Sequence, residues 1–168
     1  MKRQQMGLTL IELMVTLAVT MTLLGAGTPG IRSLLDNNRL TAQANALYAD
    51  LLYARSQAVR RGATVRVVAR DGDWNQGWDV VDARVEEDHP ARLIKAGELP
   101  QPGLYISADD QVLEVDYRHS GTLAGRAMVT LSLCTDSGRG RRITVQLIGR
   151  VGLEPIADCR EPSAGIPG

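Results

Sequence analysis

The chain has 168 residues, of which 44% are hydrophobic, so it suits one domain of ordinary size and is not wholly disordered. Its 19 basic and 19 acidic side chains cancel, which excludes a uniformly basic nucleic-acid-binding protein. With only two cysteines and two histidines, it lacks the ligands of an iron–sulfur cluster or an all-protein zinc site, and we expect no metal and no cofactor.

The amino terminus has a short basic leader, residues 1–7, followed by 20 residues (8–27) whose only charge is Glu12. At about 1.5 Å per residue, a helix of this length spans the roughly 30 Å core of a bilayer. Lys2 and Arg3 place the leader in the cytoplasm. We therefore expect a transmembrane helix over 8–29. A cleaved secretory signal fits less well, because the apolar stretch is long and contains a carboxylate.

Glu12 is the unusual residue of this segment. A carboxylate within a spanning helix costs roughly 2.5–3.5 kcal/mol and is kept mainly when a cation pairs with it. Cleavage after Gly7 would supply that cation, the free amine of Leu8, to Glu12 of a neighbouring copy. The alternative is an acid at the membrane interface.

Apolar residues at steps of three and four between residues 31 and 61 predict an amphipathic helix over 30–62, ended by Gly62. Its apolar stripe consists of Leu40, Ala44, Leu47, Leu51, Ala54 and Ala58. The opposite face is expected to carry Arg39, Gln43, Asp50, Arg55 and Gln57.

Residues 63–168 contain short segments rich in β-branched residues, separated by turn residues, which predict a β domain. Strands are expected at 64–69, 78–82, 104–107, 112–117, 127–133 and 142–148, with a brief one at 93–94 and a turn at Asp71-Gly72. The fold class is therefore α+β: a long amino-terminal helix packed on an antiparallel sheet or sandwich.

Residues 25–30 match the G-x-G-x-x-G pattern of dinucleotide-binding loops. Pro29 lacks the N–H that such a loop needs, and the alternation of strands and helices does not follow. We expect these residues to loosen or kink the helix instead.

The segment from Gly7 to Leu13 resembles the class III signal of type IV pilins and pseudopilins, and residues 37–61 and 74–78 resemble the FimT/GspH branch of minor pseudopilins. The resemblance implies cleavage between Gly7 and Leu8 by prepilin peptidase, N-methylation of Leu8, and a role for Glu12 in assembly. It also implies that the protein is a structural subunit and not an enzyme. Such a subunit is anchored in the inner membrane by one helix, with its carboxy-terminal domain in the periplasm, and is later assembled into a filament.

The implied partners are other minor and major pilins or pseudopilins. FimT members belong to type IV pili, help to start assembly near the tip and in some cases take part in DNA uptake. GspH members belong to type II secretion. The sequence favours the FimT type and leaves the GspH type as the alternative.

Cys134 and Cys159 both lie in the part expected outside the cytoplasm, where oxidation persists. Pairing them would close a loop worth roughly 3 kcal/mol in the chain-entropy model. We predict a disulfide, with two free thiols as the alternative.

Four arginines lie near the carboxy terminus: Arg139, Arg141, Arg142 and Arg150. Arginine forks pair with phosphate oxygens, so these residues predict weak, salt-dependent binding of double-stranded DNA. The alternative is solvated arginines or pairing with the acidic middle segment. DNA-binding FimT members typically carry Gly-Arg-x-Arg before the last cysteine. Here Gly149-Arg150 keeps only the first half, so Arg150 alone is carried over.

Overall fold

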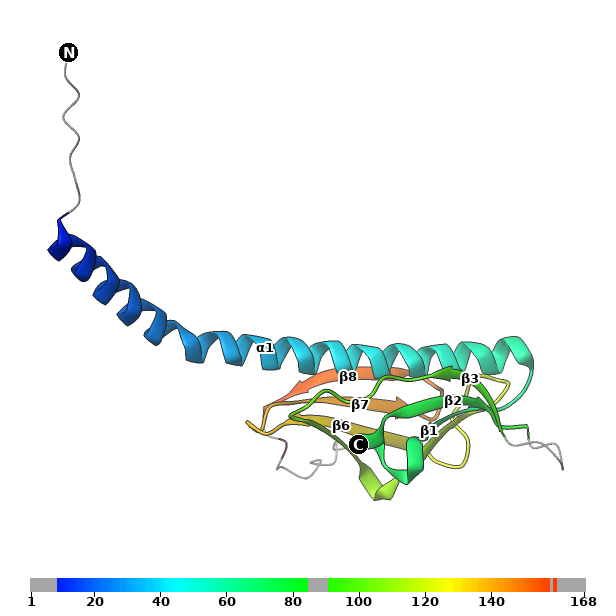
Figure 1. Cartoon of the computed structure of the whole chain (residues 1–168). Coiled ribbons are helices and arrows are strands. Elements are labelled where there is room, and N and C mark those ends of the chain that lie inside the picture. Colours follow the sequence, from blue (N-terminus) through cyan, green and yellow to red (C-terminus); the bar gives the residue numbers. More distant parts are fainter. Residues whose placement is uncertain (1–8, 85–90, 158, 160–168) are drawn as a thin grey trace, which may run out of the picture. The chain divides into compact units, whose positions relative to one another are not determined.

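The structure is a computed structural model that describes residues 9–84, 91–157 and 159, with the backbone alone for residues 24–33. It divides into two compact units, Met1–Asn37 and Asn38–Gly168, which are described separately. In the described residues one helix, α1 (Leu10–Arg61), is followed by eight strands (Figure 1).

Helix α1 contains 52 residues and is α-helical through residues 25–30 as well as on either side of them. It ends at Arg61, and Gly62 follows its last turn as predicted. Gly62 has a φ of +62°, its N–H donates to the Val59 carbonyl, and the Ala63 N–H reaches back to the Ala58 carbonyl at 3.2 Å. These two bonds form a Schellman cap, which satisfies carbonyls that the end of the helix leaves free.

The predicted apolar stripe of the helix is confirmed. Leu40, Ala44, Leu47, Leu51, Ala54 and Ala58 are all buried. The prediction was wrong for Gln43, Asp50 and Gln57, which are also buried. The second unit explains the difference, because residues 38–61 of α1 run across both sheets (Figure 1) and the covered face of the helix is wider than one stripe.

The strands form two antiparallel sheets of four in the order β3-β2-β1-β5 and β4-β6-β7-β8. The first sheet consists of β1 (Val65–Ala69), β2 (Trp78–Asp82), β3 (Arg92–Ala96) and β5 (Glu114–Tyr117). The second consists of β4 (Leu104–Ala108), β6 (Met128–Thr135), β7 (Gly140–Gln146) and β8 (Val151–Ile156). Buried side chains from both sheets and from α1 form one core cluster, so the α+β fold predicted from the sequence is confirmed.

The carboxy-terminal strands differ from the prediction. The strand expected at 142–148 lies at Gly140–Gln146, and β8 was not predicted. Gly152 and Pro155 are the reason that β8 was not predicted, since both residues are unfavourable inside a strand. Pro155 is tolerated because β8 is an edge strand.

Two short 3-10 turns, η1 (Arg70–Gly72) and η2 (Trp74–Gln76), connect β1 to β2. Asp71 and Gly72 both have positive φ, so the turn predicted at this pair is present. Trp74 and Trp78 are both buried. The indole N–H of Trp74 donates to the Val112 carbonyl, and that of Trp78 donates to the Asp50 carboxylate.

Candidate functional site

Glu12 lies in the first turn of α1, three residues after Thr9. The Glu12 backbone N–H lies 3.4 Å from the Thr9 hydroxyl oxygen. This is half of a capping box, whose S/T-x-x-E spacing is visible in the sequence and was not used in the prediction. Near a helix amino terminus a carboxylate is also favoured by the helix dipole. Gly7 and Leu8 lie outside the described residues, so cleavage and methylation there stay predictions.

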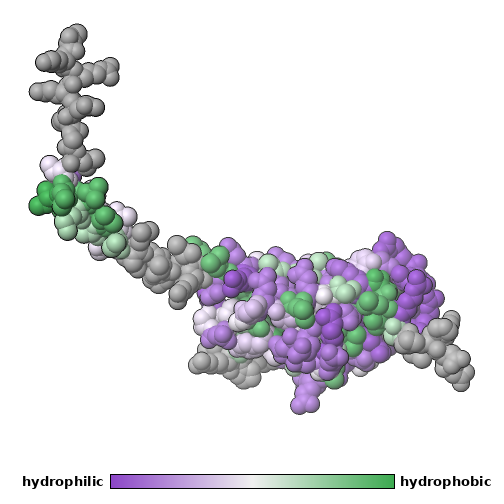
Figure 2. Space-filling view, in the orientation of Figure 1, coloured by the Kyte–Doolittle hydropathy of each residue, from purple (hydrophilic) through white to green (hydrophobic). Residues whose placement is uncertain are grey.

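The first part of α1 has apolar side chains on all sides, and Figure 2 shows them in green. The hydroxyls of Thr16, Thr20 and Thr22 donate to carbonyls three or four residues earlier in the helix. These threonines therefore need no water to satisfy their hydroxyl donors. Among the described residues, no helix is long and apolar enough to qualify as a membrane span.

Cys134 and Cys159 are joined in a disulfide, as predicted. Cys134 is buried near the end of β6, and the Cys159 N–H donates to the Gly138 carbonyl at 2.9 Å. Gly140 lies directly against the bridge, and a Cβ at this position would overlap the Cys159 sulfur. The disulfide thus fixes Cys159 beside the β6–β7 turn.

The four arginines predicted to contact DNA do not share one surface. Arg139 lies in the β6–β7 turn and Arg150 in the β7–β8 turn, at opposite ends of a strand that is roughly 20 Å long. Arg141 and Arg142 are neighbours on β7, so their side chains leave opposite faces of the sheet. Arg141 donates to the Thr41 hydroxyl on α1 at 3.1 Å, and Arg142 lies 3.7 Å from the Glu154 carboxylate on β8.

Other arginines pair with acids of the middle segment. Arg66 binds both oxygens of Asp116, at 2.6 and 2.8 Å, and also reaches Glu114 at 2.9 Å. The hydrogen bond to Asp116 is the largest cause that raises the pKa of Arg66. Arg70 pairs with Asp79 in the same way, so these cations are tied to the first sheet.

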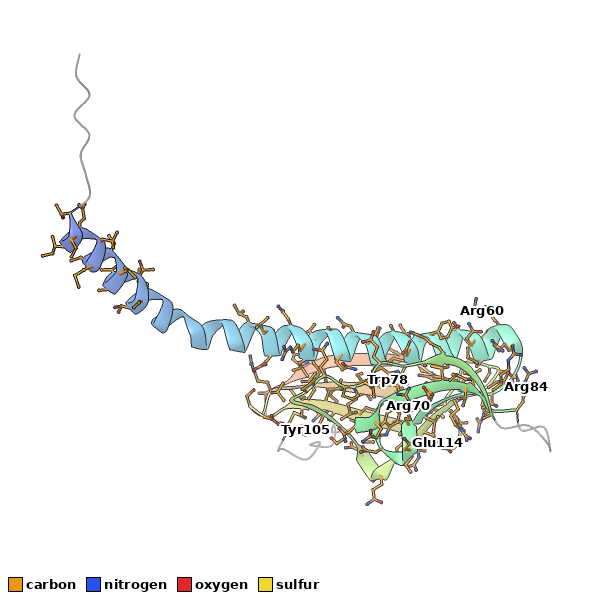
Figure 3. The ribbon with its side chains drawn as sticks, viewed as in Figure 1. Arg60, Arg70, Trp78, Arg84, Tyr105 and Glu114 are labelled. Carbon is orange, nitrogen blue, oxygen red and sulfur yellow. A yellow bond between two sulfur atoms is a disulfide. The ribbon has the colours of Figure 1, made fainter. Side chains whose placement is uncertain are left out.

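A further charge cluster lies where α1 and β2 end. The buried Asp82 carboxylate accepts from the Arg84 guanidinium at 2.7 Å and lies 3.5 Å from Arg61. The hydrogen bond from Arg84 is the main cause that lowers the pKa of Asp82. Figure 3 shows Arg84 and Arg60 at this end of the second unit and Tyr105 at the other.

Arg55, which was predicted to lie on the polar face of the helix, makes contacts with two distant turns. Its Nε donates to the Gly121 carbonyl at 2.9 Å, and its Nη2 donates to the Ile148 carbonyl at 3.0 Å. Arg55 therefore holds two turns, one after β5 and one after β7, which are far apart in the sequence. No local pattern predicts such a contact, because both acceptors are backbone carbonyls.

Two protein-family models match this chain. Residues 43–149 match the family model described as type II transport protein GspH, and residues 2–28 match the prokaryotic N-terminal methylation motif. The chain belongs to the GspH family. It is thus a minor pilin or pseudopilin of the GspH/FimT group, as the sequence resemblance indicated.

Solved structures agree with this membership of the GspH family. The chain is similar to the type IV minor pilin FimU of Pseudomonas aeruginosa, with 27% identity and a TM-score of 0.60, over 75% of this chain and 98% of FimU. The minor pseudopilin EpsH of the Vibrio cholerae type 2 secretion system has 16% identity and a TM-score of 0.56, over 70% of this chain and 97% of EpsH, and shows the shared fold. Curated protein sequences give no match.

The GspH family consists of structural pilin and pseudopilin subunits and is not known for enzymatic activity. In the described part of the chain, no group of three or more His, Cys, Asp or Glu residues is placed to hold a metal ion.

Proposed function

We propose that this chain is a minor type IV pilus subunit of the FimT type, made as a precursor and assembled near the tip, where it helps to start the filament. The amino-terminal methylation motif over residues 2–28 supports this proposal most directly, together with the likeness of the chain to FimU. Prepilin peptidase would cut between Gly7 and Leu8 and methylate Leu8. The helix over 8–29 would anchor the precursor in the inner membrane before assembly.

The role of Glu12 in this proposal is electrostatic. Its carboxylate follows the new amino terminus at the fifth mature position, with apolar side chains around it. A charge in apolar surroundings is unfavourable unless a partner of opposite sign reaches it. The amine of Leu8 on an adjoining subunit would be that partner and would fix the axial offset between the two helices.

Two measurements test this proposal. Mass spectrometry of the chain purified from cells that contain the peptidase should give a mature chain that begins with methylated Leu8. Glu12→Gln and Glu12→Leu should both abolish recovery in the sheared filament fraction, whereas Glu12→Asp should keep part of it. Retention of residues 1–7, or normal incorporation of Glu12→Leu, would overturn the proposal.

A second candidate is a minor pseudopilin of type II protein secretion, without a nucleic-acid role. The GspH family description and the fold shared with EpsH favour it. Deletion of the gene separates the two candidates. Loss of surface pili with normal protein secretion supports the type IV pilus, and the reverse result supports type II secretion.

DNA binding stays a prediction for Arg139, Arg141, Arg142 and Arg150. These arginines do not form one common surface that a DNA duplex could contact. Arg142 is also tied to Glu154 within the second sheet. A DNA mobility shift by the full chain, measured at several salt concentrations, tests it. A shift that depends on salt and is lost when Arg139, Arg141 and Arg150 are changed to Ala would support the prediction, and an unchanged shift would contradict it.

A further inference from the structure

The turn between β7 and β8 has an unusual composition. The Gly149 N–H donates to the Gln146 carbonyl at 2.8 Å, which places Leu147 and Ile148 at the two central positions of a β-turn. These positions usually hold Gly, Pro, Asn, Asp or Ser. Here they hold two large apolar side chains, which are 51% and 61% exposed. The turn therefore presents apolar surface that contributes little to the core.

The same turn is held firmly in place. Arg55 donates to the Ile148 carbonyl at 3.0 Å and to the Gly121 carbonyl at 2.9 Å. Gly149 lies so close to Gly121 that a Cβ on Gly149 would overlap the Gly121 carbonyl oxygen. A turn that is ordered before it binds loses little conformational entropy on binding.

A third exposed apolar side chain lies beside these turns. A Cβ on Gly121 would lie 3.1 Å from the Val59 side chain, which is 54% exposed on α1. Val59 thus lies beside Gly121, and Arg55 links the Gly121 carbonyl to the Ile148 carbonyl. The exposed residues Val59, Leu147 and Ile148 therefore belong to segments that these contacts join. We call these three residues the apolar tip. Exposed apolar surface of this kind, next to polar residues, is typical of protein–protein contacts.

Three exposed arginines belong to the same segments of the chain as the apolar tip and the Gly121 turn. Arg118 and Arg150 are exposed in the two turns, and Arg60 follows Val59 on α1. In the described part of the chain no ion pair is formed by any of these three arginines. The segments 118–126 and 146–151 contain no acidic residue. The tip therefore has a positive rim in a chain whose net charge is zero.

We infer that the apolar tip and its arginine rim dock a different pilin-like subunit, whose contact surface has an apolar patch bordered by carboxylates. The inference rests on the proposed assembly role. A symmetric pair of copies would bring two arginine rims together, which like-charge repulsion disfavours. DNA is a poorer partner, because its phosphate backbone would offer no apolar contact to the side chains of Leu147 and Ile148.

The test uses the full chain in its own cells, with Ile148→p-benzoylphenylalanine as the photo-crosslinking probe. The matched control carries the same probe at Leu113, which is 48% exposed and lies directly before β5, at the opposite end of that strand from Arg118 and Gly121. We expect one specific adduct from position 148 and none from position 113. Mass spectrometry should place the adduct on another pilin-like subunit, close to Asp or Glu residues.

Charge variants then test the rim. Arg118→Glu with Arg150→Glu should lower the yield of the adduct about fivefold or more, since like charges would face each other. Arg118→Lys with Arg150→Lys should retain it, because a positive charge is kept. The inference would be overturned by an adduct whose yield does not change on charge reversal, or by one that forms equally from position 113. An adduct that joins two copies of this chain, or that nuclease removes, would overturn it as well.

The filament fraction of the same cells separates this inference from the proposed function. If the chain is present there and position 148 gives no adduct, the docking surface is wrong and the assembly role stands. If the chain is absent from the filament fraction in every variant, the assembly role fails and the inference fails with it.

Discussion

The carboxylate of Asp50, buried on α1, accepts a hydrogen bond from the indole N–H of Trp78 at 2.9 Å. The Lys95 ammonium on β3 binds the other oxygen of the same carboxylate. One helical residue thus joins a core strand and an edge strand of the first sheet. Lys95 is half exposed, so its charge stays partly hydrated, whereas the Trp78 N–H has no access to water.

Asp50→Ala is expected to lower the free energy of unfolding by about 1–3 kcal/mol, because it leaves the buried Trp78 N–H without an acceptor. Urea unfolding followed by tryptophan fluorescence measures this change. Lys95→Met in the Asp50→Ala background should add little, since the lysine then has no partner to lose. Equal stability of Asp50→Ala and the parent chain would show that the contact does not stabilise the fold.

The Asp82 cluster predicts a dependence of stability on pH. The hydrogen bond from Arg84 lowers the pKa of Asp82 in the folded chain below its value in the unfolded chain. Its stabilising contribution is therefore fully present above the ordinary Asp pKa of about 3.9 and is lost as the pH falls through the lower folded value. Asp82→Asn should cost about 1–2 kcal/mol at pH 7 and progressively less in acid.

The free energies of unfolding of Asp82→Asn and the parent chain, measured from neutral to acid pH, show whether the difference between them shrinks in acid as expected. The control is Asp136→Asn, at an exposed aspartate, whose effect on the free energy of unfolding should be small. A difference between Asp82→Asn and the parent chain that grows toward acid pH would contradict the assignment.

Gly140→Ala should prevent or weaken the disulfide, because its Cβ would overlap the Cys159 sulfur and lie 2.8 Å from the Leu133 carbonyl oxygen. Titration of free thiols in the unfolded, unreduced chain measures this directly. Gly152→Ala is the matched control in the neighbouring strand, since its nearest contact would be an ordinary 3.9 Å. The first variant should show reactive thiols and the second should not.

Gly149→Ala tests the close approach of the two turns. Gly149 and Gly125 both have positive φ, and a Cβ on Gly125 meets nothing within 4 Å. Gly125→Ala should therefore cost only the left-handed backbone strain, about 1 kcal/mol. Gly149→Ala should cost clearly more, because it also pushes the Gly121 carbonyl away from Arg55. Thermal unfolding of both variants compares the two costs, and equal melting temperatures would refute the close contact.

Patterns that are local in the sequence predicted much of this protein. Helical period, turn chemistry and β propensity act over a few residues, and they predicted the stripe from Leu40 to Ala58, the cap at Gly62 and most of the strands. The amino-terminal motif was identified by its resemblance to the signal of type IV pilins. The Cys134–Cys159 pair was predictable because the chain contains only these two cysteines and the expected compartment is oxidising.

Contacts between distant segments were decided by the tertiary structure alone. The burial of Gln43 and Asp50 and the contacts of Arg55 with two turns follow from where the sheets lie around residues 38–61 of the helix. β8 formed despite Gly152 and Pro155, since pairing with β7 outweighed weak local propensity. Local propensities are small compared with the free energy of packing and pairing, so sequence patterns indicate the elements and long-range contacts fix which side chains share a surface.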